Sequence, residues 1–117
     1  MNTYKTYNNI AKEGINHLES YGFKEEKSNP DALLIRSHLL KESDFNKSLK
    51  CICRAGAGVN HIPIKNATDR GVVVFNTPGG NANAVKELVI CGLLLSSRGI
   101  VQGHSFAKSL EDMNSEE

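Results

Sequence analysis

The stretch from Lys50 to Val59, which reads Lys-Cys-Ile-Cys-Arg-Ala-Gly-Ala-Gly-Val, decides the fold class. Its first half is a short apolar run without strict polar alternation, and its second half is a glycine-rich loop. Apolar runs of this kind are typical of strands that are buried on both faces of a parallel sheet. We therefore predict a strand at Lys50–Arg54 that leads into a loop at the carboxyl edge of such a sheet.

Outward from this stretch, apolar strands alternate with helical segments. The further strands are expected at Tyr4–Tyr7, Ala32–Ile35 and Val72–Phe75. Apolar spacing and the residues at segment ends predict helices at Ile10–Ser20, Ser43–Lys47 and Ile64–Arg70. The alternation predicts an α/β fold, namely a flavodoxin-like, three-layer parallel sheet with helices on both faces.

A long apolar helix is predicted to follow, from Ala82 to Ser97 or beyond, as far as residue 103. A surface helix needs only one apolar stripe. Here the apolar side chains spread around most of the circumference, at Val85, Leu88, Val89, Ile90, Leu93, Leu94 and Leu95. Such a helix requires cover from a second domain or a second chain, and we predict a homodimer through it.

Composition and charge exclude several classes of partner and site. The 117 residues suffice for one compact domain, and the net charge of +1 gives no reason to expect nucleic acid or an acidic membrane. Three cysteines do not form a disulfide framework, and Cys51 and Cys53 are interpreted as buried strand residues rather than half of a metal site. No metal is expected. The polar first residues do not resemble a signal peptide, so a cytoplasmic location is the default.

The glycine-rich loop is not a dinucleotide fingerprint, because His61 stands where the third glycine should be. A loop at this edge can instead present backbone N–H groups to an anion. Arg36 and Ser37 directly follow the strand Ala32–Ile35 and reach the same edge. We therefore predict an anion site from Arg36, Ser37, Gly56, Ala57 and Gly58. The alternative, that Arg36 is an ordinary surface residue at a strand end, stays open.

Four motifs, in order, resemble the D-isomer-specific 2-hydroxyacid dehydrogenases. The motifs are Ile35-Arg36-Ser37, Arg54-Ala55-Gly56-Ala57-Gly58-Val59, Phe75-Asn76-Thr77-Pro78-Gly79-Gly80-Asn81 and Ala84-Val85-Lys86-Glu87-Leu88. The resemblance covers roughly residues 3 to 110 and is strongest to the branch that oxidises 3-phosphoglycerate with NAD in serine biosynthesis. It implies that residues 1–81 are part of an outer, substrate-binding domain and that residues 82–103 are an interdomain or dimerisation helix. The polar composition after this helix predicts a mobile tail at residues 104–117.

The resemblance also implies roles for single residues. The five residues of the predicted anion site would face the carboxylate or phosphate of the substrate, while Ala57, Asn81 and Val85 would border the nicotinamide of NAD. Ala57 stands where family members often have Thr, and Asn60-His61 where they usually have Asp-Asn. The acid–base His–Glu pair and the true cofactor fingerprint of the family lie beyond the matched segment. We therefore expect no catalytic residue here and no activity from these residues alone; the alternative is a non-catalytic anion-binding or dimerisation module.

Overall fold

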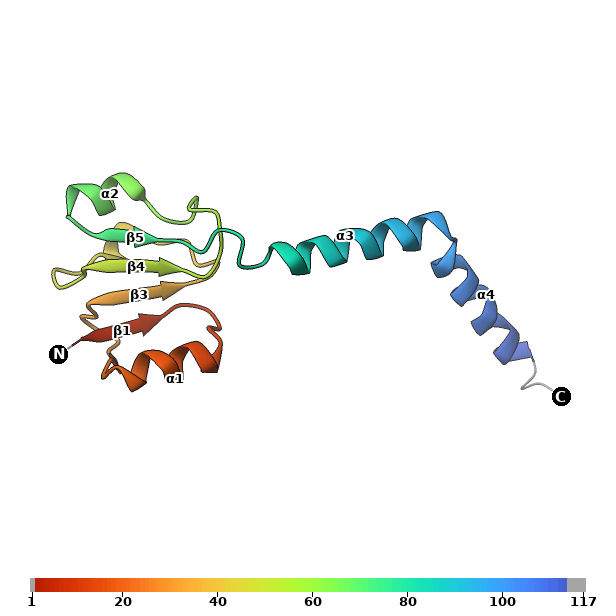
Figure 1. Cartoon of the computed structure of the whole chain (residues 1–117), viewed down its shortest axis with the longest axis horizontal. Coiled ribbons are helices and arrows are strands. Elements are labelled where there is room, and N and C mark those ends of the chain that lie inside the picture. The colour runs from red at the N-terminus through yellow and green to blue at the C-terminus, as the bar shows by residue number, and fades with distance from the viewer. Residues whose placement is uncertain (1, 114–117) are drawn as a thin grey trace. The chain divides into compact units, whose positions relative to one another are not determined.

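The computed structural model describes residues 2–113, which fall into two compact units. The first unit is Met1–Gly80 and the second is Asn81–Glu117. The first unit contains a sheet with short helices, and the second contains two helices (Figure 1).

The first unit is built on a five-stranded parallel sheet. Its strands follow the order β2-β1-β3-β4-β5, which is the flavodoxin-like order. The strands are β1 Thr3–Thr6, β2 Lys24–Glu25, β3 Ala32–Ile35, β4 Cys51–Arg54 and β5 Val73–Phe75. The predicted α/β class and parallel sheet are therefore confirmed, and one strand, β2, was missed. Two consecutive charged residues carry no strand signal, and their extended form depends on pairing with β1.

Two helices connect neighbouring strands, and a single 3-10 turn lies between β3 and β4. Helix α1, Lys12–Ser20, joins β1 to β2, and helix α2, Ile64–Asp69, joins β4 to β5. These two connections step across the sheet in opposite directions, so right-handed crossovers place α1 and α2 on opposite faces. The short turn η1 occupies Glu42–Asp44 and replaces the expected helix at residues 43–47.

The core lies on the face of the sheet that α2 and the segment around η1 cover. Leu33, Ile35 and Ile52 are almost completely buried there. The cluster is completed by Leu40, Phe45, Leu49, Ile62, Ala67 and Val72. Such a small aliphatic core agrees with a sequence that has no Trp and few aromatic residues.

The opposite face of the sheet is covered less completely over β4 and β5. Val73 and Phe75 are 53% and 54% exposed, and they pair with Cys51 and Cys53 across the ladder. The two thiols are free and half-buried instead of fully buried, because little packs over this part of the sheet. Among residues 2–113 there is no group of three side chains that could hold a metal ion.

The second unit consists of α3, Ala82–Ser97, and α4, Ile100–Met113. The prediction of one helix through residue 103 was wrong, because Gly99 adopts φ +60° and ends α3. Residues 104–113, expected to be part of a polar, mobile tail, are helical and belong to α4; residues 114–117 lie outside the described part. No helix within residues 2–113 combines the length and apolar character that crossing a membrane requires.

Candidate functional site

The carboxyl ends of β3 and β4 bring the predicted anion-site residues to one edge of the sheet. Ile35 pairs with Arg54, and the Ala55 N–H donates to the Ile35 carbonyl at 2.8 Å. The chain segments that begin at Arg36 and at Gly56 therefore leave the sheet side by side. The structure thus gathers Arg36, Ser37, Gly56, Ala57 and Gly58, the five residues expected from sequence.

Arg54, which sequence reasoning did not single out, connects the two loops. Its Nε donates to the Arg36 carbonyl at 3.1 Å, and its Nη1 donates to the Gly58 carbonyl. One planar guanidinium thus holds both loops in a fixed relation. The available signal was an arginine placed between a buried strand and a glycine-rich loop, where its side chain can fold back over the loop.

The glycines of the loop make room for this guanidinium. A Cβ at Gly56 would lie 3.0 Å from Arg54 Nη1, and Gly56 has φ +155°. A Cβ at Gly58 would lie 3.2 Å from the same atom. Because both positions face Arg54 so closely, the glycines serve packing against the arginine as well as access for a ligand.

One of the three backbone N–H groups at Gly56–Gly58 already has an acceptor in the protein, so the loop offers fewer donors to an anion than expected. The Gly56 N–H donates to Thr77 Oγ1 at 2.7 Å, so it cannot also serve an anion well. Asn76 Nδ2 donates to the Ala57 carbonyl at 2.7 Å, and the two side chains together fix the loop against the end of β5. Within the described residues, the N–H groups of Ala57 and Gly58 donate to no protein acceptor. They remain the loop's candidates for binding an anion.

The segment after β3 is fixed from the other side by Asn8. Its Oδ1 accepts from the N–H of Ser37 at 3.0 Å and from the N–H of His38 at 2.8 Å. Asn8 has φ +68°, a left-handed conformation that asparagine tolerates better than most residues. The backbone N–H of Ser37 is therefore occupied, and its hydroxyl is what remains for a ligand.

Beside Arg36 lies an open hollow with a volume of about 480 Å³. Its walls are mainly apolar. They come from the segment between β1 and α1, from α1 itself and from the ends of β3 and β4, and the lining residues are Asn9, Ile10, Ala11, Gly14, Arg36 and Ala55. Arg36 makes no ion pair with a carboxylate in the part of the chain that is described. A free guanidinium at the rim of an apolar hollow suits a small organic anion. Residues 9–11 were missed because they match no motif.

The remaining predicted contacts belong to the other unit or have structural partners. Asn81 and Val85 lie in the second unit, which has no defined position relative to Ala57 and the loop. His38 stacks on Tyr7 with ring centroids 4.1 Å apart, and His17 meets Tyr21 edge to face. Both histidines thus have packing contacts, and His38 Nε2 also lies 3.9 Å from Asp44 Oδ2.

The loop also lacks the geometry of a pyrophosphate site. A dinucleotide fingerprint leads directly into a helix whose N-terminus faces the phosphates. Here residues 59–62 form a turn, with the Ile62 N–H donating to the Val59 carbonyl at 2.9 Å, and α2 begins only at Ile64. The residues of this loop do not fit the pyrophosphate of a dinucleotide, in agreement with the interpretation of His61.

Comparison with known proteins adds independent information. Residues 8–116 match the family described as D-isomer specific 2-hydroxyacid dehydrogenase, catalytic domain. The chain is 43% identical over 84 residues to the D-3-phosphoglycerate dehydrogenase of Bacillus subtilis, covering 69% of this chain and 16% of the relative. It is 35% identical over 89 residues to the hydroxypyruvate reductase of Thermotoga maritima, covering 74% and 29%. The chain thus matches less than a third of the length of these curated relatives.

The fold is also similar to that of a solved dehydrogenase structure. The chain superimposes on NAD+-bound 3-phosphoglycerate dehydrogenase from Entamoeba histolytica with a TM-score of 0.68 and 26% identity. The match covers 80% of this chain and 38% of that chain.

Proposed function

The chain belongs to the D-isomer specific 2-hydroxyacid dehydrogenase family, and from that membership we propose that it supplies the substrate-anion side of an NAD-dependent D-3-phosphoglycerate dehydrogenase. The whole enzyme would oxidise 3-phosphoglycerate to 3-phosphohydroxypyruvate. The observation that carries the proposal is the meeting of Arg36 with the Ala57–Gly58 loop at one sheet edge. The similarity to phosphoglycerate dehydrogenases supports the choice of substrate.

In this proposal each group at the sheet edge has a defined task. The Arg36 guanidinium binds an anionic end of the substrate, and the N–H groups of Ala57 and Gly58, with the Ser37 hydroxyl, add hydrogen bonds. Arg54 positions both loops, so it acts through the site's geometry. The apolar hollow accommodates the carbon chain of the substrate. A hydroxypyruvate-type substrate would use the same carboxylate contacts.

NAD would supply the hydride acceptor in the whole enzyme. We assign to this chain only contacts at the nicotinamide end, from Ala57, Asn81 and Val85. The binding of the pyrophosphate is assigned to residues outside this chain, because the Gly56–Gly58 loop does not fit it. This chain alone is therefore proposed to bind the anion without turnover, and a cytoplasmic location is proposed with it.

The proposal is tested by calorimetry with 3-phosphoglycerate and by a turnover assay on the same preparation. Arg36→Gln should weaken binding by about tenfold or more, because charge-assisted hydrogen bonds contribute about 1.5–3 kcal/mol. Arg98→Gln, the same change at the end of α3, is the matched control and should leave binding unchanged. Equal affinities for both variants would contradict the role of Arg36. Reduction of NAD above the blank would contradict the proposed inactivity.

The second proposal is a non-catalytic module that binds anions or dimerises. It is favoured by the exposure of α3, where Leu88 is 74% exposed and Leu93 is 63% exposed. In that case the chain would associate through α3 with a second copy of itself. A dehydrogenase continuation with a cofactor fingerprint in the gene directly downstream of Glu117 would favour the first proposal over this one.

A further inference from the structure

A second cavity lies on the core face of the sheet, away from Arg36 and the glycine-rich loop. Its volume is about 70 Å³, and its polar wall carries Lys5, Tyr7, Lys27, Ser28, Ser43 and Asn46. Ligand pockets for organic molecules usually measure ~300–1,000 Å³. The cavity therefore holds an ion or a single small group and not a whole organic ligand.

The connection between β2 and β3 creates this cavity. Glu25 of β2 and Ala32 of β3 both pair with Tyr4 of β1, so the chain crosses over β1 between these two residues. Those six residues, 26–31, are too few for a helix that would fill the face. This return segment, residues 26–31, leaves a gap that is lined by Lys27 and Ser28 and by Lys5 on β1 and Leu33 on β3.

Two lysines, Lys5 and Lys27, line the cavity beside one carboxylate, that of Asp44. Neither Lys5 nor Lys27 forms an ion pair among the residues that the structure describes. The Lys5 Nζ instead lies 4.7 Å from the centroid of the Tyr7 ring. In addition, the hydroxyls of Ser28 and Ser43 donate no hydrogen bond in the described part of the chain. Four donor groups, the two ammonium groups and the two hydroxyls, thus belong to residues that line this small cavity.

Asp44 also lines the cavity and is the group that could disfavour an anion. Both of its oxygens already have donors: Oδ1 accepts from the Tyr7 hydroxyl and Oδ2 from the Lys41 N–H, each at 2.8 Å. These bonds stabilise its negative charge within the protein. The formal charge of the cavity wall remains +1 after Asp44 is counted against the two lysines.

We propose that this cavity, bordered by Lys5, Lys27, Ser28 and Ser43, is a binding site for a tetrahedral oxyanion of the phosphate type. The two ammonium groups supply charge, and the two hydroxyls supply short hydrogen bonds. The occupant is free inorganic phosphate or the phosphoryl group of a larger ligand that stays outside the cavity mouth. The site is independent of the proposed substrate site, because it shares no residue with it.

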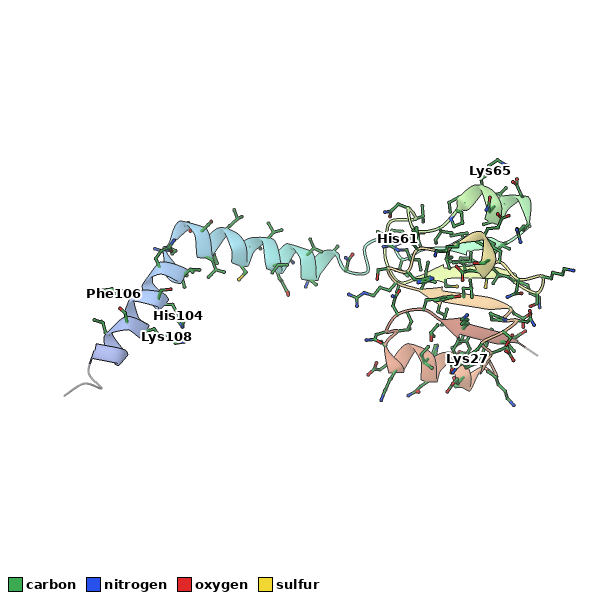
Figure 2. The ribbon with its side chains drawn as sticks, turned by 180° about the vertical axis from the view of Figure 1, so that it is seen from behind. Lys27, His61, Lys65, His104, Phe106 and Lys108 are labelled. Carbon is green, nitrogen blue, oxygen red and sulfur yellow. The ribbon has the colours of Figure 1, made fainter. Side chains whose placement is uncertain are left out.

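The site is tested by NMR titration of the whole chain with inorganic phosphate at constant ionic strength. Saturable shifts are expected at the amides of Lys5, Tyr7 and Ser28. Lys27→Met should weaken binding by about tenfold, as expected when one charge-assisted contact is lost. Lys65→Met is the matched control, because Lys65 lies on α2 beside Asp69, far from Lys27 (Figure 2). Ser28→Ala provides a second, conservative variant on the exposed return segment.

The outcomes decide the proposal in each case. Shifts that rise linearly without saturation, or equal phosphate affinity in Lys27→Met and Lys65→Met, would overturn it. A parallel titration with 3-phosphoglycerate separates the two sources of the oxyanion. If inorganic phosphate shifts the amides of Lys5 and Ser28, the site binds the free ion. If only 3-phosphoglycerate shifts them, the site binds the phosphoryl group of a larger ligand. Shifts with neither ligand would also overturn the proposal.

Discussion

At the scale of single residues, Arg54 explains more of the candidate site than any other side chain. It binds the carbonyls of Arg36 and Gly58, and the two loop glycines leave the space that its guanidinium fills. The motif predicted a glycine-rich loop for ligand access. The structure adds that the glycines also accommodate a neighbouring side chain, which no local pattern in the sequence shows because the contact depends on how the loop folds back.

Replacement of Gly56 tests this packing directly. Gly56→Ala should lower the free energy of unfolding by about 1 kcal/mol, because the new Cβ meets Arg54 Nη1 at 3.0 Å with φ at +155°. Gly14→Ala in α1 is the matched control, since its Cβ would meet no atom within 4 Å and it should stabilise the helix by about 0.5–1 kcal/mol. Urea denaturation measures both. If both variants change the free energy of unfolding equally and in the same direction, the packing role of Gly56 is contradicted.

Asp31 gives a second prediction at this scale. The Lys50 ammonium, 2.7 Å away, and hydrogen bonds from Thr3 lower the pKa of the Asp31 carboxyl to about 2. A lowered pKa in the folded state means that the stabilisation is present above the ordinary pKa and is lost as the pH falls from about 4 towards 2. Asp31→Asn should therefore flatten the dependence of stability on pH in this window.

The measurement for Asp31 is the urea midpoint at a series of acidic pH values. Lys50→Met should reduce the same pH dependence, because it removes the main cause of the lowered pKa. An unchanged acid profile in both variants would show that Asp31 has no such linkage.

At the scale of elements, the regular strands were predictable and the boundaries set by tertiary contacts were not. Strands β3, β4 and β5 were predicted to within a residue, because each is a continuous apolar run. β2 is a pair of charged residues that pairs with β1, so no local pattern reveals it. The end of α3 depended on Gly99, which stands directly after Arg98 and was passed over in favour of the continuing apolar pattern.

The apolar surface of α3 leads to a prediction of self-association. Leu88 is 74% exposed, and Val89, Ile90 and Leu94 are also about half exposed. Exposed apolar surface of this extent favours association. Sedimentation at micromolar concentration should show a dimer for the chain and a shift towards monomer for Leu88→Glu. Lys86→Glu on the same helix is the control and should stay dimeric; a monomeric unmodified chain would contradict the prediction.

At the scale of the whole molecule, the central feature of the chain is a sheet edge with anion donors. The family and the fold were predictable from four ordered motifs, three of which stand at the carboxyl ends of β3, β4 and β5. The sequence could not predict which backbone N–H groups of the glycine-rich loop stay free to bind an anion. The Gly56 N–H is occupied by Thr77, a residue 21 positions later in the chain.

The most direct test of the central claim is an NMR titration of the 117-residue chain with 3-phosphoglycerate. The claim is that the edge formed by Arg36, Ser37, Ala57 and Gly58 binds an anionic end of this substrate. The account predicts saturable amide shifts at these four residues, with the Gly56 amide less affected because it donates to Thr77. Saturable binding that leaves these amides unchanged, or no saturable shift anywhere, would contradict it.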